Sequence, residues 1–386
     1  MKRLSVAAIM FMIMLLAVAG TGSAGPVKDG IKLGAIGPFT GAAAGPGMEI
    51  FNSIKLAVEE RNAKGGLGGV KVELVMGDNA GDAAQGVNVA EKFSSDAKVY
   101  GVIGPAMSNI TAATLRIFGG AGLVHISTAA SKSDLTEKGF NTFFRVCARN
   151  DAHGPAVANY IANDLKVKSV YLLNAKDAYS QNLTDEVAKT LKKLGVADVW
   201  RDTVVSGDKD YSPVLTKVKS RNPELVLFAT KPAPDMTIMI RQMRDLGIKA
   251  VFFGTEGAKD KKEFIGASEG AAEGAYVYHF AADINKVPAA QGYVKAFEAK
   301  YGSLSGFGPS AYEAANILLD AMAKAAQDGK ITRKEVRDNV AATKNRPGIL
   351  GFPVTFDAKG DLQGGATYIF QVRNGEFKMI SVAKGK

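Results

Sequence analysis

The chain has 386 residues, of which 47% are hydrophobic and 22% charged, a balance typical of soluble globular proteins. This length exceeds the size at which one hydrophobic core usually divides, so the sequence predicts two domains. The formal net charge of +10 raises the question of a nucleic-acid partner. However, the lysines are scattered and often lie beside Asp or Glu, as in residues 259–263, and no basic run is interleaved with aromatics. We therefore expect a solvated basic surface and no nucleic-acid partner.

The first 24 residues have the three parts of a secretory signal peptide. Two basic residues precede the uncharged apolar run Leu4–Val18, and small residues follow up to Ala24, the predicted cleavage site, with Ala19 as the second choice. The run is shorter than the ~20 residues that span a bilayer, and no later segment is apolar enough to do so. The only cysteine, Cys147, lies far from the cleavage site, which excludes an N-terminal lipid anchor and an intramolecular disulfide. We expect a soluble protein in the periplasm.

Short apolar, β-branched runs alternate with longer amphipathic stretches along most of the chain. This alternation predicts parallel sheets covered by helices on both faces, and uninterrupted runs such as residues 225–228 favour strands buried on both sides. The stretches between them carry apolar residues at helical spacing, for example Phe51, Ile54 and Val58. The predicted strands are Ile31–Ile36, Val70–Met76, Tyr100–Ile103, Leu123–Ile126, Thr142–Val146, Ser169–Leu173, Asp202–Val205, Leu225–Phe228, Ala250–Phe253 and Ala275–His279.

The end of the chain departs from this rhythm. A short strand is predicted over Pro353–Phe356, and strands over Thr367–Val372 and Phe377–Ser381 flank an Asn-Gly pair at 374–375, a strong signal for a β-hairpin. We place the boundary between two α/β lobes near residues 147–151, where a strand ends in polar residues. No Pro/Gly/Ser-rich linker marks it, which argues against two domains joined like beads on a string.

Candidate binding residues lie in loops that follow predicted strands, because ligands of open parallel sheets bind beyond the carboxyl ends of the strands. Ser108 lies at the start of one predicted helix, and Ser131 lies three residues before Asp134. A helix N-terminus with a hydroxyl suits an anion such as a carboxylate. The alternative for each Ser is a simple helix N-cap, worth about 1 kcal/mol.

Glu256 follows the apolar run 250–253 directly and is expected to project where a ligand would lie. A carboxylate in a partly buried cleft needs a cation or a hydrogen-bond partner, and a ligand ammonium would supply one. The alternative, a solvated loop acid, fits this residue equally well.

The sequence motifs that would indicate an enzyme are weak. Residues 266–270 fit the G-x-S-x-G pattern of a nucleophile elbow, but they follow a charged stretch rather than a strand, and only three His are present. We expect a surface loop there. The same scarcity of His and Cys argues against a zinc site, and the glycines of residues 41–47 have the wrong spacing for a dinucleotide site. We expect no catalysis, no metal and no cofactor.

Several of these segments together resemble the branched-chain amino-acid (Leu/Ile/Val) binding proteins of ABC transporters, which have the type I periplasmic binding fold. The resemblance covers essentially the whole mature chain in the right order. It is carried by residues 31–41, 62–66, 101–105, 126–130, 254–257 and 356–361.

The resemblance implies two doubly wound α/β lobes joined by three crossings, with residues 25–149 and 282–357 in the first lobe and 150–281 and 358–386 in the second. It implies a monomer that closes on a small ligand and serves an inner-membrane ABC permease. The carboxylate of the ligand would be held by Ser108, beside Met107, and by Ala129 and Ser131. Its ammonium would be held by Glu256 and the carbonyl of Ala129, with Tyr179 covering the ligand and Phe307 lining the pocket.

The sequence departs from the family at two aromatic positions. Pro46 replaces a Tyr usual in the first loop, and residues 231–234 (Lys-Pro-Ala-Pro) replace an aromatic after the 225–228 strand, so that Lys231 enters near the mouth of the cleft. These changes leave open a small carboxylate, such as an aromatic acid, in place of an amino acid. They also leave open an exported ligand sensor. A repressor of the same architecture would need an N-terminal helix-turn-helix, where the signal peptide stands.

Overall fold

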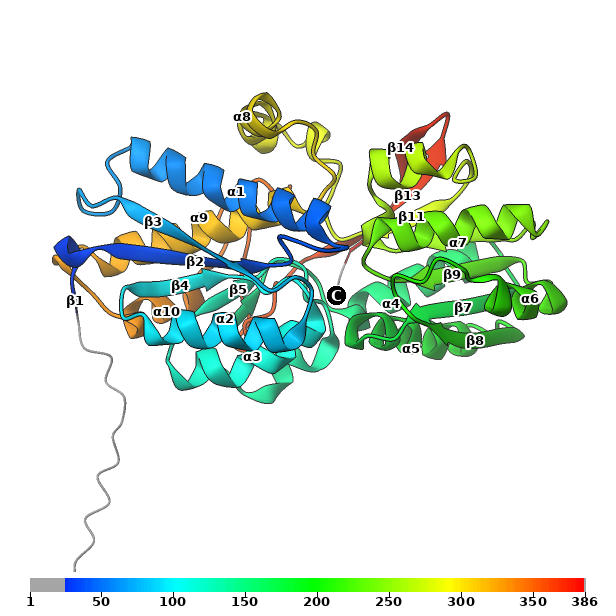
Figure 1. Cartoon of the computed structure of the whole chain (residues 1–386), viewed down its shortest axis with the longest axis horizontal. Helices are drawn as coiled ribbons and strands as arrows, with labels where there is room; N and C mark the ends of the chain where they lie inside the picture. The colour runs from blue at the N-terminus through cyan, green and yellow to red at the C-terminus, as the bar shows by residue number, and fades with distance from the viewer. Residues whose placement is uncertain (1–24, 385–386) are drawn as a thin grey trace, which may run out of the picture.

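A five-stranded parallel sheet forms the core of the first lobe in the computed structural model, which describes residues 25–384. Its order is β3-β2-β4-β5-β6, and helices α1 and α9 pack together on one side while α2 and α3 pack on the other (Figure 1). All five residues of β4 are buried, as expected for a strand covered on both faces. The elements are β2 (Ile31–Gly37), α1 (Ala44–Ala63), β3 (Val72–Asp78), α2 (Ala83–Ser95), β4 (Val99–Ile103), α3 (Ser108–Gly120), β5 (His125–Ser127) and β6 (Phe143–Arg145).

The second lobe has a seven-stranded sheet in the order β14-β13-β11-β10-β9-β7-β8. The five strands from β11 to β8 are parallel, and β13 and β14 add an antiparallel edge. The elements are α4 (Asn150–Asn159), β7 (Ser169–Ala175), α5 (Ala178–Lys193), β8 (Asp198–Val204), α6 (Ser212–Arg221), β9 (Leu225–Ala229), α7 (Ala233–Asp245), β10 (Val251–Gly254), β11 (Tyr276–His279), β13 (Ala366–Arg373) and β14 (Glu376–Lys384).

The predicted hairpin at the end of the chain is confirmed. Arg373 pairs with Glu376 across a two-residue turn, in which Asn374 and Gly375 have φ of 55° and 69°. Positive φ at both positions is the type I′ geometry that Asn-Gly favours. The strand predicted over residues 353–356 is wrong, because Val354 and Phe356 form only isolated bridges, with Arg346 and Leu362.

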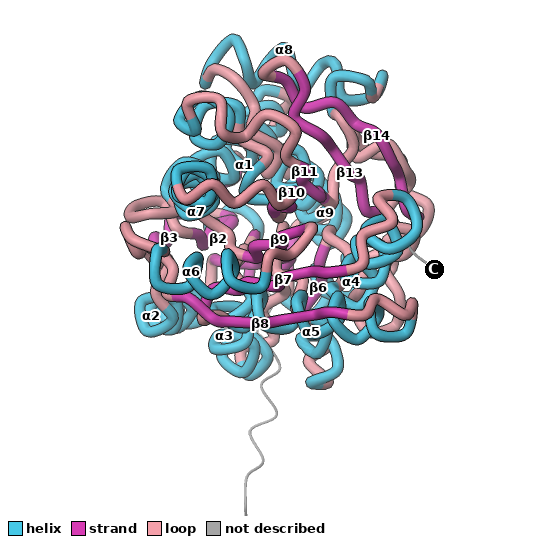
Figure 2. The backbone as a smooth tube through the Cα atoms, turned by 90° about the vertical axis from the view of Figure 1, so that its right-hand side faces the viewer, coloured by secondary structure: helices cyan, strands magenta, loops and turns pink. Residues whose placement is uncertain are grey.

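The chain crosses between the lobes three times, so the predicted fold class is confirmed. It leaves the first lobe after β6 and returns after β11 to add α8 (Gln291–Tyr301), α9 (Gly308–Ala325) and α10 (Arg333–Ala341). It then crosses once more to reach β13. Figure 1 shows α9 and α10, in orange, among the blue and cyan elements of the first lobe, and Figure 2 looks at the second lobe end-on. A short β1 (Gly25–Pro26) pairs with β12 (Lys330–Ile331).

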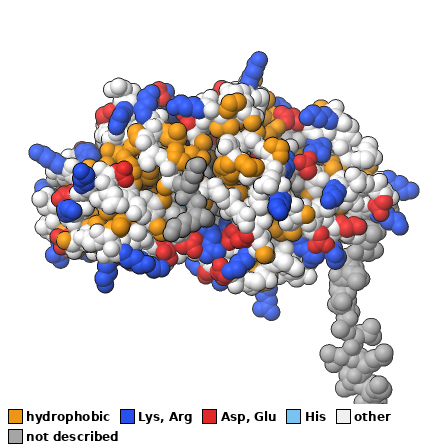
Figure 3. Space-filling model, turned by 180° about the vertical axis from the view of Figure 1, so that it is seen from behind, with side chains coloured by type: hydrophobic (Ala, Val, Ile, Leu, Met, Phe, Trp, Pro, Cys, Tyr) orange, Lys and Arg blue, Asp and Glu red, His pale blue; other side chains and the backbone are white. Residues whose placement is uncertain are grey.

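Charged side chains of both signs are spread over the two lobes on the face in Figure 3. Within residues 25–384, no helix is both long and apolar enough to cross a membrane. The same range contains no group of three or more His, Cys, Asp or Glu placed to hold a metal ion. The predicted signal peptide lies outside the described residues.

Candidate functional site

The two lobes meet through loops at the carboxyl ends of their parallel strands. The ammonium of Lys231, in the loop after β9, lies 3.0 Å from the carbonyl oxygen of Ala129, in the loop after β5. Nearby, the side chain of Asn182 in α5 accepts hydrogen bonds from the backbone N–H and the hydroxyl of Ser133. The strand ends of both sheets therefore converge on one place, as expected for an open α/β architecture.

A buried ion pair occupies this place. Lys231 Nζ donates to Glu256 Oε1 at 2.7 Å, and the two side chains are only 10% and 1% exposed. The same ammonium lies 4.3 Å above the ring centroid of Tyr179, within cation–π distance. Lys231 is therefore held by a carboxylate, a carbonyl and an aromatic face. The alternative of a solvated loop acid at Glu256 is wrong.

The second oxygen of Glu256 accepts a hydrogen bond from the hydroxyl of Tyr179, which is 2.8 Å from the hydroxyl of Tyr278. Burial by itself would raise the pKa of Glu256. The charge and hydrogen bond of Lys231, with the tyrosine hydroxyls, outweigh burial and lower this pKa to about 2. Glu256 is thus an anion at neutral pH, fully committed to groups of this chain.

Two residues beside Glu256 explain why the loops after β9 and β10 come so close. Thr255 donates its hydroxyl hydrogen to the carbonyl of Thr230 at 2.6 Å. A Cβ at Gly257 would lie 1.8 Å from the carbonyl oxygen of Lys231, so only glycine permits this approach. The Thr-Glu-Gly sequence therefore positions the backbone of Lys231 as well as the Glu256 carboxylate.

The predicted carboxylate-binding residues lie together in the first lobe. Ser108 begins α3, and its hydroxyl accepts from the N–H of Lys132 at 3.2 Å. The N-cap of α3 is Met107 and that of the turn at 133–138 is Lys132, without side-chain caps, so neither Ser108 nor Ser131 is an N-cap. The hydroxyl of Ser131 is buried and has no hydrogen-bond partner among the described residues.

The loop that carries Ala129 and Ser131 is held by Arg145, a residue that sequence analysis missed. Arg145 in β6 is fully buried and donates Nη1 hydrogens to the carbonyls of Ala130 at 3.0 Å and Lys132 at 2.8 Å. Its Nε donates to the carboxylate of Asp361, which lies in the third crossing. A charged residue inside the strand predicted over 142–146 was the available signal, because buried arginines need partners.

A small pocket lies between these loops, with a cavity volume of about 30 Å³ in the present arrangement of the lobes. Apart from Lys231, the side chains that line it are apolar. The lining residues are Pro38, Ala43, Pro46, Gly47, Ile50, Ala106, Met107, Ala129, Lys231 and Phe307. Of the predicted ligand residues, Met107, Ala129 and Phe307 line this pocket. Tyr179 was expected to cover the ligand, but its ring lies under Lys231 and its hydroxyl is bonded to Glu256.

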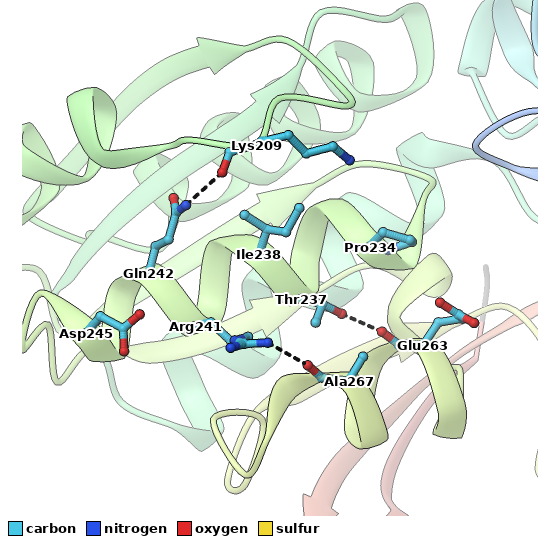
Figure 4. A pocket seen from close by; sticks show the side chains of 9 residues that line it. All are labelled: Lys209, Pro234, Thr237, Ile238, Arg241, Gln242, Asp245, Glu263 and Ala267. Carbon is cyan, nitrogen blue, oxygen red and sulfur yellow. Dashed lines mark hydrogen bonds between the residues drawn. The ribbon is translucent and has the colours of Figure 1, made fainter.

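Another hollow runs along α7, wholly within the second lobe (Figure 4). Its hydrogen bonds, such as that from the hydroxyl of Thr237 to the carbonyl of Glu263, tie α7 to the adjoining turns. The G-x-S-x-G segment, residues 266–270, adjoins this hollow and lies at the surface as expected, with every residue exposed except Ser268. Ser268 is buried, and its hydroxyl donates to the carbonyl of Ile265. Ser268 thus has a local structural role.

Residues 30–376 match a family described as periplasmic binding protein. The chain is 32% identical over 334 residues to the Leu/Ile/Val-binding protein BraC3 of Rhizobium johnstonii, with 86% of this chain and 89% of that protein covered. A leucine binding protein from Thermotoga maritima has a similar structure, with a TM-score of 0.83 at 25% identity, covering 92% and 98% of the two chains. A branched-chain amino acid transporter substrate binding protein from Streptococcus pneumoniae, in complex with isoleucine, has a TM-score of 0.82 at 27% identity, covering 92% and 99%.

Proposed function

Because this chain belongs to the periplasmic binding protein family, we propose that it is an extracytoplasmic receptor that captures a small carboxylate-bearing solute between its lobes and delivers it to an inner-membrane ABC permease. The resemblance seen in the sequence is confirmed by the family match and by the relatives named as Leu/Ile/Val-binding proteins. The solute is an amino acid, as in the isoleucine complex of the S. pneumoniae protein, or a small carboxylate that lacks an amine. The family is one of solute receptors rather than enzymes.

The observation that carries this proposal is the convergence of both lobes on one apolar pocket. Lys231 of the second lobe contacts Ala129 of the first and supplies the one charged group among the pocket-lining residues. A carboxylate suits that cation. Ser108 and Ser131 are buried next to the lining residues Met107 and Ala129 in the chain, and they do not themselves line the pocket. A ligand that contacts both lobes stabilises the closed form by its difference in affinity for the closed and open forms.

Delivery to a permease is favoured over sensing by the transporter relative named above. We propose further that the protein acts in the periplasm as a monomer, with the first lobe in residues 25–149 and 282–357 and the second in 150–281 and 358–386. These limits are supported by the sheets: the strands β2 to β6 lie within the first-lobe ranges, and β7 to β11, β13 and β14 lie within the second-lobe ranges.

A thermal-shift screen of the chain that begins at Gly25 tests the proposal. The panel contains L-leucine, L-isoleucine, L-valine, benzoate, 4-hydroxybenzoate and aliphatic carboxylates, with benzamide and glucose as uncharged controls. A ligand at about 100 times its Kd adds about 2.7 kcal/mol to the unfolding free energy, a shift of several degrees. We expect stabilisation by at least one carboxylate. Stabilisation by uncharged solutes alone would contradict the proposal.

A further inference from the structure

We infer that Lys231 is a built-in ammonium that occupies the cation position of the pocket, so that the receptor selects apolar carboxylates lacking an amine. This inference rests on the proposed receptor function and names its solute class. It is carried by the contacts of Lys231, which satisfy the acceptors that an incoming ammonium would need.

The acceptors at the centre of the cleft are already used. Glu256 Oε1 and the carbonyl of Ala129 both accept from Lys231, and Glu256 Oε2 accepts from Tyr179. An α-ammonium entering here would meet a like charge and would have to displace Lys231, trading one ion pair for another. The amine of a ligand therefore adds desolvation cost without a new partner.

The pocket side of Lys231 is suited to an anion. An ammonium has three N–H donors, and the contacts with Glu256 and Ala129 use two of them. No other hydrogen bond of this Nζ is found among the described residues, and the ammonium is itself part of the pocket wall. The third N–H therefore has no hydrogen-bond acceptor among the described residues, and its neighbour is the ring of Tyr179, 4.3 Å away. A ligand carboxylate is a stronger partner than a ring face, because it accepts a charge-assisted hydrogen bond.

Lys231 is also held where it stands. Its backbone packs against Gly257 at a distance that admits no side chain, and Pro232 follows directly with its restricted φ. Its ammonium rests on the ring of Tyr179 at 4.3 Å. Swinging the side chain into solvent would leave the Glu256 carboxylate, 1% exposed, without a cation, which is the costly way to break a buried ion pair.

The other residues that line the pocket determine which chemical groups the solute can carry besides its carboxylate. Pro38, Pro46, Ile50, Met107 and Phe307 present apolar surface to the pocket. Such a lining offers nothing to hydroxyl-rich or doubly charged solutes. The geometry points to a monocarboxylate with a compact alkyl or aryl body.

Matched ligand pairs that differ only in the α-amine test the inference by titration calorimetry. The pairs are 4-methylpentanoate with L-leucine, and 3-phenylpropanoate with L-phenylalanine. We expect the wild type to bind the amine-free member of at least one pair about 100-fold more tightly. In Lys231→Met, we expect this preference to reverse, because the carboxylate loses its partner while an α-ammonium gains Glu256. Lys249→Met, which removes an exposed lysine of the second lobe, should keep the wild-type preference.

Lys231→Met leaves a buried carboxylate without its cation and could fail to fold for that reason. The double variant Lys231→Met/Glu256→Gln is the control, because it leaves no unpaired buried charge. This double variant should bind neither class well. Equal or tighter binding of the amino acids by the wild type would overturn the inference and leave the proposed function standing. A wild-type preference for the amine-free acids that survives Lys231→Met would also overturn it. If the wild type binds no member of either pair, the inference fails. The proposed function fails with it only if no carboxylate of the thermal-shift panel stabilises the protein.

Discussion

Replacement of Glu256 by Gln should destabilise the protein by about 3 kcal/mol at neutral pH. The pKa of Glu256 falls from its ordinary 4.5 to about 2 in the folded protein, because the contacts with Lys231 outweigh burial. At about 1.4 kcal/mol per pH unit, this difference gives about 3 kcal/mol. The figure agrees with the 3–5 kcal/mol, roughly, that removal of one partner from a buried ion pair costs.

The pH dependence of this effect has a definite sign. A carboxylate whose pKa is lowered by folding contributes stability that is present above its unfolded value and lost as the pH falls toward its folded value. The difference between wild type and Glu256→Gln should therefore be full above pH 4.5 and shrink between pH 4.5 and 2.

Urea denaturation of both proteins at pH 7 and at several acidic pH values measures the difference. The double variant Lys231→Met/Glu256→Gln is the control, because removing a buried pair as a whole is close to neutral. A double-mutant cycle then isolates the coupling between the two side chains. An unfolding free energy of Glu256→Gln within about 0.5 kcal/mol of wild type, with no coupling in the cycle, would refute the ion-pair reasoning.

Two further substitutions test neighbouring parts of the structure. His125 is fully buried between Phe118 and Phe143, and burial lowers its pKa to about 3, so the unfolded chain takes up the proton first as the pH falls below 6.5. The unfolding free energy of His125→Leu, compared with that of wild type, should therefore be about 2 kcal/mol more favourable at pH 5 than at pH 8. Urea denaturation at the two pH values measures this change, and the same difference between the proteins at both would contradict the reasoning. Gly257→Ala places a Cβ 1.8 Å from the carbonyl of Lys231 and should cost at least about 2 kcal/mol of stability and weaken ligand binding, whereas an unchanged melting temperature would show that the two loops separate freely.

Local patterns were sufficient for much of the fold. The alternation of apolar runs and amphipathic stretches located the strands of both sheets to within a few residues, and the Asn-Gly pair at 374–375 located the final hairpin. The rule that ligands bind beyond strand ends directed attention to the loops that carry Ser108, Ala129 and Glu256. Lys231 was noticed only as a departure from the family that the sequence resembles. These features depend on residues close together in sequence, where periodicity and turn chemistry act directly.

The partners of the charged residues were decided only by the tertiary structure. Lys231 contacts Ala129 across 102 residues of sequence, and Arg145 contacts Asp361 across 216. Such contacts depend on strand order and on how two lobes face each other, which no local pattern encodes. From sequence, Glu256 required a cation but did not reveal whether a ligand or the chain supplied it. The folded protein supplies Lys231, because the strand order β11-β10-β9 sets the loops after β9 and β10 side by side and Gly257 lets them touch.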